Sequence, residues 1–440
     1  MTGAAEEPGP DEEGPAPDAE GPGPDEEAAP RIVAVPLLEP RDGMPPLVGT
    51  ADALADATQR LAHGHGPVAV DAERASGFRY GHRAFLVQLR RGGAGTVLID
   101  PVACPDLSGI NTVLADVEAV IHAASQDLPC LSDLGYRPQL LFDTELAGRL
   151  LGYPRVGLGT LVESVLGLTL EKSHSAADWS TRPLPEEWLR YAALDVEVLV
   201  ELRDALADQL AEQGKSEWAR QEFAAELSAE PPPPRPEPWR RTSGIHRVRN
   251  QRGLAAVREL WTVRDEIAQR RDIAPGRILP DSAIIDAATA DPKTHDDLVA
   301  LPIFGGKRQR RSAATWLAAL KAARESPGPG DETDPPNGPP APARWARRRP
   351  EAAARLDAAR AALRELSEQV TVPSENLVTP DLVRRLCWDW EAADDTAAAV
   401  DKFLAAGQAR SWQRELVVPV LAAALQPPPN DSDDVSPAAQ

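Results

Sequence analysis

The chain has 440 residues, 42% of them hydrophobic, and a formal net charge of −21 at pH 7. This length exceeds what one hydrophobic core usually serves, so we expect two to four domains. No stretch approaches the roughly 20 apolar residues of a membrane span, and the acidic N-terminus does not resemble a secretory signal. Its few cysteines, Cys104, Cys130 and Cys387, lack C-x-x-C spacing, which argues against disulfides and structural zinc and favours a cytoplasmic location.

Proline-rich stretches predict the division into domains. Residues 1–30 carry ten acidic and no basic residues, which predicts a disordered acidic tail, and residues 426–440 are expected to be a second disordered tail. Residues 230–239 and 325–343 are expected to be Pro-rich linkers. The predicted domains between these segments are residues 31–229, 240–324 and 344–425.

The first predicted domain mixes strands and helices. Strands are expected at 68–71, 84–90, 96–99 and 118–122, where apolar and β-branched residues cluster. From Asp143 onward the pattern becomes helical, ending in a long helical stretch over 185–214. Strands followed by helices in this order predict an α/β sheet with flanking helices.

The two later domains show helical periodicity and no strand pattern. Both begin with a long helix and later contain a Gly-containing turn, so we expect two copies of one helical module. Their charges differ: residues 240–324 hold 17 basic and 9 acidic residues, net +8, whereas residues 344–425 hold 12 of each. Residues 31–229 have a net charge of −11, so the basic module is the part expected to meet a polyanion.

Acidic side chains in the first domain have the arrangement that a two-metal phosphodiesterase needs. Asp71 and Glu73 are two residues apart, hence on one face of a strand, and Asp127 follows a later strand. Tyr191 and Asp195 are four residues apart, hence on one face of a helix. Two divalent cations about 3.5–4 Å apart require hard oxygen ligands of this kind. A solvated strand end and an ordinary helix cap would explain single members of this set, but not the ordered set.

These stretches also carry a family resemblance. DAERASGFRYGHRAFLVQL, IHAASQDL and LTLEKSHSAADWSTRPLPEEWLRYAALD resemble the DEDDy 3′–5′ exonuclease superfamily, most closely the ribonuclease D family. The resemblance implies a ribonuclease H-like fold with a mixed sheet, and two divalent ions, Mg²⁺ or Mn²⁺. It implies that Asp71 bridges the two ions, that Glu73 and Asp195 complete the first site, and that Asp127 supports the second. Tyr191 would orient the attacking water, assisted by Glu73.

The basic module resembles an HRDC domain, a small helical nucleic-acid-binding module. The stretches RDIAPGRILPDSAIIDAA and LPIFGGKR carry this resemblance. Glycines in the second stretch let the backbone approach a phosphate, and nearby cations would neutralise it. The predicted RNA-contacting residues are Lys307, Arg308, Arg310 and Arg311. A solvated basic helix face is the alternative. The last domain resembles a diverged second HRDC domain, which could serve as a clamp or spacer.

The resemblance therefore implies a metal-dependent 3′–5′ exoribonuclease that trims structured RNA ends, such as those of tRNA precursors. We expect a monomer that binds neither a membrane nor a nucleotide cofactor. A DNA 3′–5′ exonuclease and a non-catalytic RNA-binding protein remain as alternatives. The sequence contains no GxxxxGK[ST] motif, which disfavours an ATP-driven helicase.

Overall fold

The computed structural model describes residues 34–171, 174, 176–230, 233, 235–326, 328, 338–391 and 393–426. The predicted acidic tail, nearly all of the C-terminal tail and much of the second linker lie outside these residues. In the part of the chain that the structure describes, no helix is long and apolar enough to cross a membrane.

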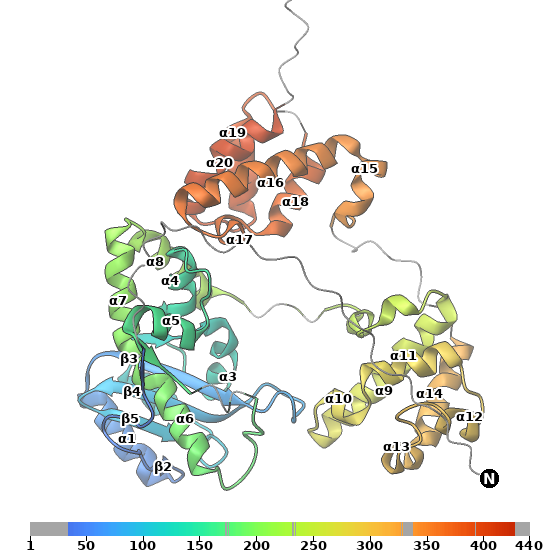
Figure 1. Cartoon of the computed structure of the whole chain (residues 1–440), viewed down its shortest axis with the longest axis horizontal. Helices are drawn as coiled ribbons and strands as arrows, with labels where there is room; N and C mark the ends of the chain where they lie inside the picture. The colour runs from blue at the N-terminus through green and yellow to red at the C-terminus, as the bar shows by residue number, and fades with distance from the viewer. Residues whose placement is uncertain are drawn as a thin grey trace, which may run out of the picture. The chain divides into compact units, whose positions relative to one another are not determined.

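The first part of the chain forms a six-stranded mixed sheet with strand order β2-β5-β4-β3-β6-β7 (Figure 1). Its strands are β2 (Leu47–Val48), β3 (His65–Arg74), β4 (Ala84–Gly92), β5 (Gly95–Ile99), β6 (Glu118–Ile121) and β7 (Leu140–Asp143). Strands β3, β4 and β5 pair in antiparallel fashion, whereas β2, β6 and β7 add in parallel. Two short strands, β1 (Val35–Pro36) and β8 (Leu168–Thr169), pair separately. The predicted mixed α/β sheet is confirmed.

Helices flank this sheet and connect its strands. Those before the last strand are α1 (Ala51–His63), α2 (Ser108–Val113) and α3 (Leu128–Asp133). Those after it are α4 (Thr144–Leu150), α5 (Leu158–Leu166), α6 (Glu186–Glu197), α7 (Leu199–Glu212) and α8 (Ser216–Ser228). The helical stretch expected over 185–214 consists of two helices, because a turn at Val198 separates α6 from α7. Strand β7 was missed, since four residues are too few to show a period.

Strand β3 lies between β4 and β6, which explains its apolar run. Val68, Ala69 and Val70 are fully buried, as expected for a strand covered on both faces. Helix α6 crosses β3, β4 and β5 (Figure 1). Its buried Ala192 and Ala193 have small side chains, which allow the helix to approach the sheet closely. The end of β3 is therefore held directly against α6.

The two later segments are all helical. The first contains short 3₁₀ turns (Pro238–Arg241 and Ile245–Arg247), α9 (Gln251–Arg271), α10 (Pro275–Ile278), α11 (Asp281–Ala290), α12 (His295–Val299), α13 (Lys307–Arg311) and α14 (Ala313–Glu325). The second contains a 3₁₀ turn (Pro342–Arg344), α15 (Trp345–Arg348), α16 (Pro350–Val370), α17 (Ser374–Leu377), α18 (Pro380–Asp389), α19 (Thr396–Ala406) and α20 (Ser411–Leu425). In both segments a 21-residue helix is followed by helices of 4 and 10 residues.

Candidate active site

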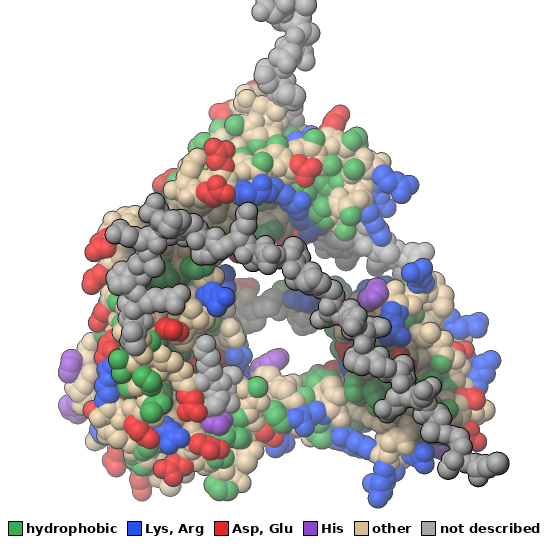
Figure 2. All heavy atoms as spheres, in the orientation of Figure 1, with side chains coloured by type: hydrophobic (Ala, Val, Ile, Leu, Met, Phe, Trp, Pro, Cys, Tyr) green, Lys and Arg blue, Asp and Glu red, His purple; other side chains and the backbone are tan. Residues whose placement is uncertain are grey.

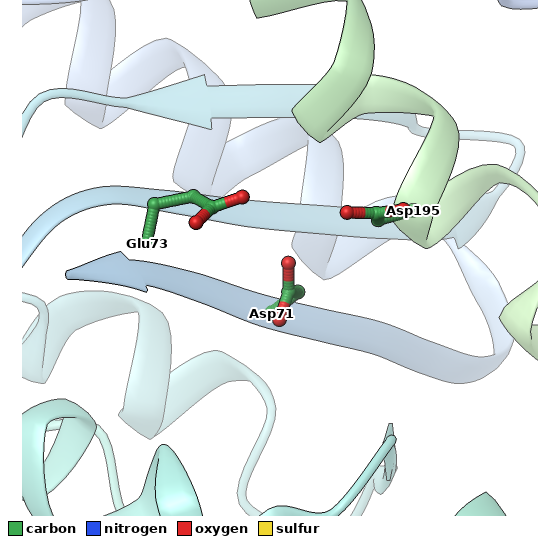
Figure 3. Close-up of side chains that lie close together, drawn as sticks. All are labelled: Asp71, Glu73 and Asp195. Carbon is green, nitrogen blue, oxygen red and sulfur yellow. The ribbon is translucent and has the colours of Figure 1, made fainter. Parts of the chain in front are cut away.

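Three of the predicted carboxylates converge at the contact between β3 and α6. Asp71 and Glu73 extend from β3 and Asp195 extends from α6 toward them (Figure 3). One ligand oxygen from each of the three lies within 4.8 Å of the other two. Two-residue spacing places the first two on one strand face, and the crossing of α6 brings the third. This is the only such group of His, Cys, Asp or Glu side chains among the residues that the structure describes.

Burial and mutual repulsion disfavour the charged forms of these acids. Burial, with smaller contributions from Asp71, Asp195 and Asp127, raises the pKa of Glu73 to about 10. Burial, followed by the charge of Asp71, raises the pKa of Asp195 well above its ordinary value. A cation placed between these protonated acids would lower their pKa values and so favour their ionised forms. The donor set, all carboxylate oxygen, suits a hard divalent ion.

Tyr191 lies one helical turn before Asp195, which places both side chains on one face of α6. Its ring is packed by other aromatic rings, edge-on to His174 at a centroid distance of 5.8 Å and tilted to Trp179 at 6.5 Å. Burial and the charge of Asp195 raise the pKa of Tyr191, so the phenol remains a hydrogen-bond donor. The sequence indicated the position of Tyr191 but not the ring of His174 beside it.

Trp179 and Arg182 anchor the loop before α6. Trp179 is fully buried. The Arg182 guanidinium donates to both carboxylate oxygens of Asp100 at 2.7 and 2.9 Å, and to the backbone carbonyls of Trp179 and Phe85. These contacts fix the loop to β4 and to the end of β5. The loop residue Trp179, which packs against Tyr191, is therefore held in place.

Asp127 lies beside the three-acid group but is not a member of it. It occupies the position before α3, yet its side chain makes no capping hydrogen bond, so an ordinary helix cap does not explain it. Burial, followed by the charge of Asp71, raises the pKa of Asp127 to about 8. Its Oδ1 is buried and accepts no hydrogen bond from the described residues. A buried oxygen of this kind fits a ligand for a cation.

Arg74 is the cation nearest to Asp127, and the sequence analysis missed it. Its Nη2 lies 3.2 Å from Oδ1 of Asp127, and its Nη1 donates to the carbonyl of Gln126 at 2.8 Å. The available signal was its position directly after Glu73. Strict strand alternation would place its side chain on the face opposite that of Glu73.

Two further acids hold the loop that leads to Asp127. Asp143, at the N-terminus of α4, accepts backbone N–H groups from Ala123 and Ala124 as well as from its own helix. Ala123 has a left-handed conformation with φ of 57°, which costs energy in a residue other than glycine. Glu226 on α8 accepts the N–H of Ser125 at 2.9 Å. These hydrogen bonds stabilise the strained loop without using Asp127.

The raised pKa values predict that the metal-free protein loses stability as pH rises. Glu73 keeps its proton in the folded state up to about pH 10, against an ordinary pKa of 4.5. Between these values the folded state binds more protons than the unfolded state, so the free energy of unfolding falls with increasing pH. In EDTA, the Glu73→Gln variant should gain stability over the wild type between pH 5 and pH 8, measured by urea unfolding. Saturating Mg²⁺ should reduce this difference in stability between Glu73→Gln and the wild type. A difference that decreases as pH rises in EDTA would contradict the prediction.

The four predicted RNA-contacting cations lie together on α13. All four side chains are exposed, and none has an ion-pair partner among the described residues. Gln309 between them is buried; it donates to the carbonyl of Ile278 at 2.6 Å and accepts the indole N–H of Trp316 at 2.9 Å. This anchored glutamine turns the cations outward. Figure 2 shows Lys and Arg side chains gathered over this part of the helical segment.

The fold and the acidic group define a 3′–5′ exonuclease, and comparisons with known proteins agree. Residues 46–211 match the family model described as 3′–5′ exonuclease, and residues 253–320 match the HRDC domain. Residues 338–425 match a model described as the 3′ to 5′ exonuclease C-terminal domain.

Curated relatives and solved structures narrow this class. Ribonuclease D of Nitrobacter hamburgensis is 31% identical over 84% of this chain and 92% of its own length. Ribonuclease D of Granulibacter bethesdensis is 34% identical over 59% of this chain and 67% of its own length. A crystal structure of a protein from Bifidobacterium adolescentis is 39% identical and covers 89% of this chain and 99% of that chain, with a TM-score of 0.80.

The structure of Escherichia coli RNase D, described as an exoribonuclease involved in structured RNA processing, is 25% identical and covers 86% of this chain and 98% of that one, with a TM-score of 0.62. The chain therefore belongs to the ribonuclease D family. It is an enzyme that hydrolyses phosphodiester bonds, and the exonuclease domain of this family is metal-dependent.

Proposed function

We propose that this enzyme removes nucleotides from the 3′ ends of structured RNA, such as tRNA precursors, and that it acts as a cytoplasmic monomer. The observation that carries the proposal is the convergence of Asp71, Glu73 and Asp195 beside Tyr191. Structured RNA is supported by the description of the Escherichia coli relative. Three cysteines that are all free thiols accord with a reducing compartment.

We assign the site residues their roles from this geometry. Asp71, Glu73 and Asp195 would hold one divalent cation, and Asp127 with Asp71 would hold a second; both are Mg²⁺ or Mn²⁺ in the proposal. When bound, such ions acidify water and neutralise charge on the phosphate. Tyr191, held by its ring neighbours beside Asp195, would orient the attacking water through its phenolic oxygen, and Glu73 would accept a hydrogen bond from that water.

The decisive experiment uses 3′-structured RNA and a DNA of the same sequence, each labelled at its 5′ end. The proposal expects a ladder of products shortened from the 3′ end, with RNA degraded faster than DNA, in Mg²⁺ or Mn²⁺ and not in EDTA. Faster loss of DNA would favour a DNA exonuclease. RNA binding without any shortening would favour a non-catalytic binding protein, which the complete set of acids argues against.

We also propose the division into an exonuclease domain at 31–229, an HRDC domain at 240–324 and a diverged HRDC-like domain at 344–425. The matched family ranges fall inside the first two, and the third range begins six residues before the third domain. The shared order of 21-, 4- and 10-residue helices supports a duplicated module. In this proposal the HRDC domain, with its net charge of +8, supplies phosphate contacts that the acidic exonuclease domain cannot.

The cations of α13 should contribute strongly to RNA affinity. Replacing Lys307, Arg308, Arg310 and Arg311 with alanine should lower affinity and flatten the dependence of log K on log salt, by roughly 0.7–0.9 per lost phosphate contact. Binding measured at several salt concentrations tests this.

A matched control removes the same charge from exposed positions elsewhere in the segment. The control positions are Arg249, Arg252, Lys293 and Lys321. Equal slopes for the two quadruple variants would show that only net charge matters and that α13 is not a contact surface. Hydrolysis of a trinucleotide should be unaffected in both.

A further inference from the structure

Arg74 introduces a positive charge into a site otherwise built from acids. It contacts Asp127, the carboxylate that stands apart from the three-acid group, and its charge lowers the pKa of Asp71, Glu73 and Asp127 against the effect of burial. Its side chain is 24% exposed and that of Asp127 is 6% exposed, so the pair is largely shielded from water. Shielding strengthens the attraction between the two charges.

The local backbone explains how Arg74 reaches Asp127. Along β3, Glu73 pairs with Leu86 whereas Arg74 pairs with Ala84, so the register shifts between these two residues. Irregular pairing of this kind redirects side chains at the ends of strands. A second contact, from Nη1 to the carbonyl of Gln126, fixes the guanidinium on the loop that carries Asp127. The arginine is thus held at two points.

The ion pair with Arg74 leaves one carboxylate oxygen of Asp127 without a hydrogen bond from the described residues. Although Nη2 of Arg74 lies within ion-pair distance of Oδ1, that oxygen accepts no hydrogen bond from the described residues and is buried. The guanidinium therefore balances the charge of Asp127 without occupying its oxygen as a well-aligned donor would. A cation that coordinates Oδ1 directly would replace this imperfect partner.

We propose that Arg74 is a positioning residue that competes with the second divalent cation for Asp127. Arg74 holds this carboxylate in place while the cation is absent, and it weakens binding of that cation to the RNA-free enzyme. The first cation, held by Asp71, Glu73 and Asp195, is bound without this competition. The inference rests on the proposed two-cation site and adds to it the order in which the cations bind.

The test is calorimetric titration of the full-length protein with Mn²⁺ in the absence of RNA. The wild type should bind one ion tightly and a second weakly. Arg74→Gln should bind the second ion about tenfold more tightly or better, since the positive charge that competes with that ion for Asp127 is removed. Affinity for the first ion should change much less. Arg74→Lys, which retains the charge but not the two-point contact, should fall between them.

Arg83→Gln is the matched control, because it removes an exposed arginine from the loop after β3 that, in the part of the chain the structure describes, forms no ion pair with an acid of the candidate active site. It should leave both affinities unchanged. An unchanged or weaker second site in Arg74→Gln would overturn the inference, as would one bound ion in both proteins. Failure of the metal assignment itself has a different signature, namely no Mn²⁺ binding by the wild type. Thermal unfolding of each variant checks that it is folded. If Arg74→Gln does not fold, the affinity of Arg74→Lys for the second ion still tests the inference.

Discussion

Asp71→Asn should abolish RNA hydrolysis while leaving the protein folded. Asp71 contributes to the three-acid group, raises the pKa of Asp127 through its charge, and accepts a long contact of 3.4 Å from Gln88. An amide in its place removes the negative charge that would bridge two cations. We expect a loss well beyond about 100-fold, the upper end for residues that only support metal ligands. The measurement is the initial rate of 3′ shortening at saturating Mg²⁺.

Stability separates this result from simple misfolding. Because the charge of Asp71 raises the pKa of Glu73, Asp127 and Asp195, its neutralisation should leave the free energy of unfolding equal or higher in EDTA. Asp116→Asn, an exposed position in the same domain, is the control and should retain full activity. Near wild-type hydrolysis by Asp71→Asn, in protein free of host nuclease, would refute the site assignment.

Tyr191→Phe should slow the chemical step by on the order of 100-fold, the low end for an acid–base or orienting group. The ring contacts with His174 and Trp179 do not involve the hydroxyl, so the packing survives the change. Only the phenolic oxygen that would position water is lost. Single-turnover rates at saturating enzyme isolate this step from RNA binding and product release.

Tyr153→Phe provides a control of equal chemistry. Its hydroxyl donates to Gln209 at 2.8 Å between two segments of the same domain, away from the acids. It should alter stability slightly and the single-turnover rate not at all. If Tyr191→Phe retained the wild-type rate with unchanged RNA affinity, Tyr191 would be a packing residue alone.

Local periodicity explains what could be predicted. The two-residue spacing of Asp71 and Glu73 and the four-residue spacing of Tyr191 and Asp195 each determine a shared face, whatever the rest of the fold does. Strands β3, β4, β5 and β6 have enough apolar residues to be recognised, and their mixed pairing followed from the family resemblance. Only the crossing of α6 over β3, however, brings the two pairs together, and no local pattern contains that information.

The features that were missed depend on contacts between distant segments. Arg74 reaches Asp127 because of a register shift that depends on which residues of β4 pair with β3. Glu226 meets the backbone of Ser125 across 101 positions of sequence. The long helical stretch is divided at Val198, although no proline or glycine near that position predicts a helix end. The contacts of Arg74 and Glu226 are therefore determined by residues far away in the sequence, and the sequence near each of them does not predict them.

The loop before α3 has a practical consequence for capturing natural substrates. Its backbone shape depends on Asp143 and Glu226, whereas the carboxylate of Asp127 caps nothing. Asp143 and Glu226 thus stabilise the loop, whereas the side chain of Asp127 does not. Replacing Asp127 with asparagine should therefore leave the loop conformation unchanged. If the proposed roles hold, a chain altered only there should keep its proposed RNA contacts while hydrolysis stops, and it would then be a suitable bait for crosslinking and sequencing the transcripts that it binds in living cells.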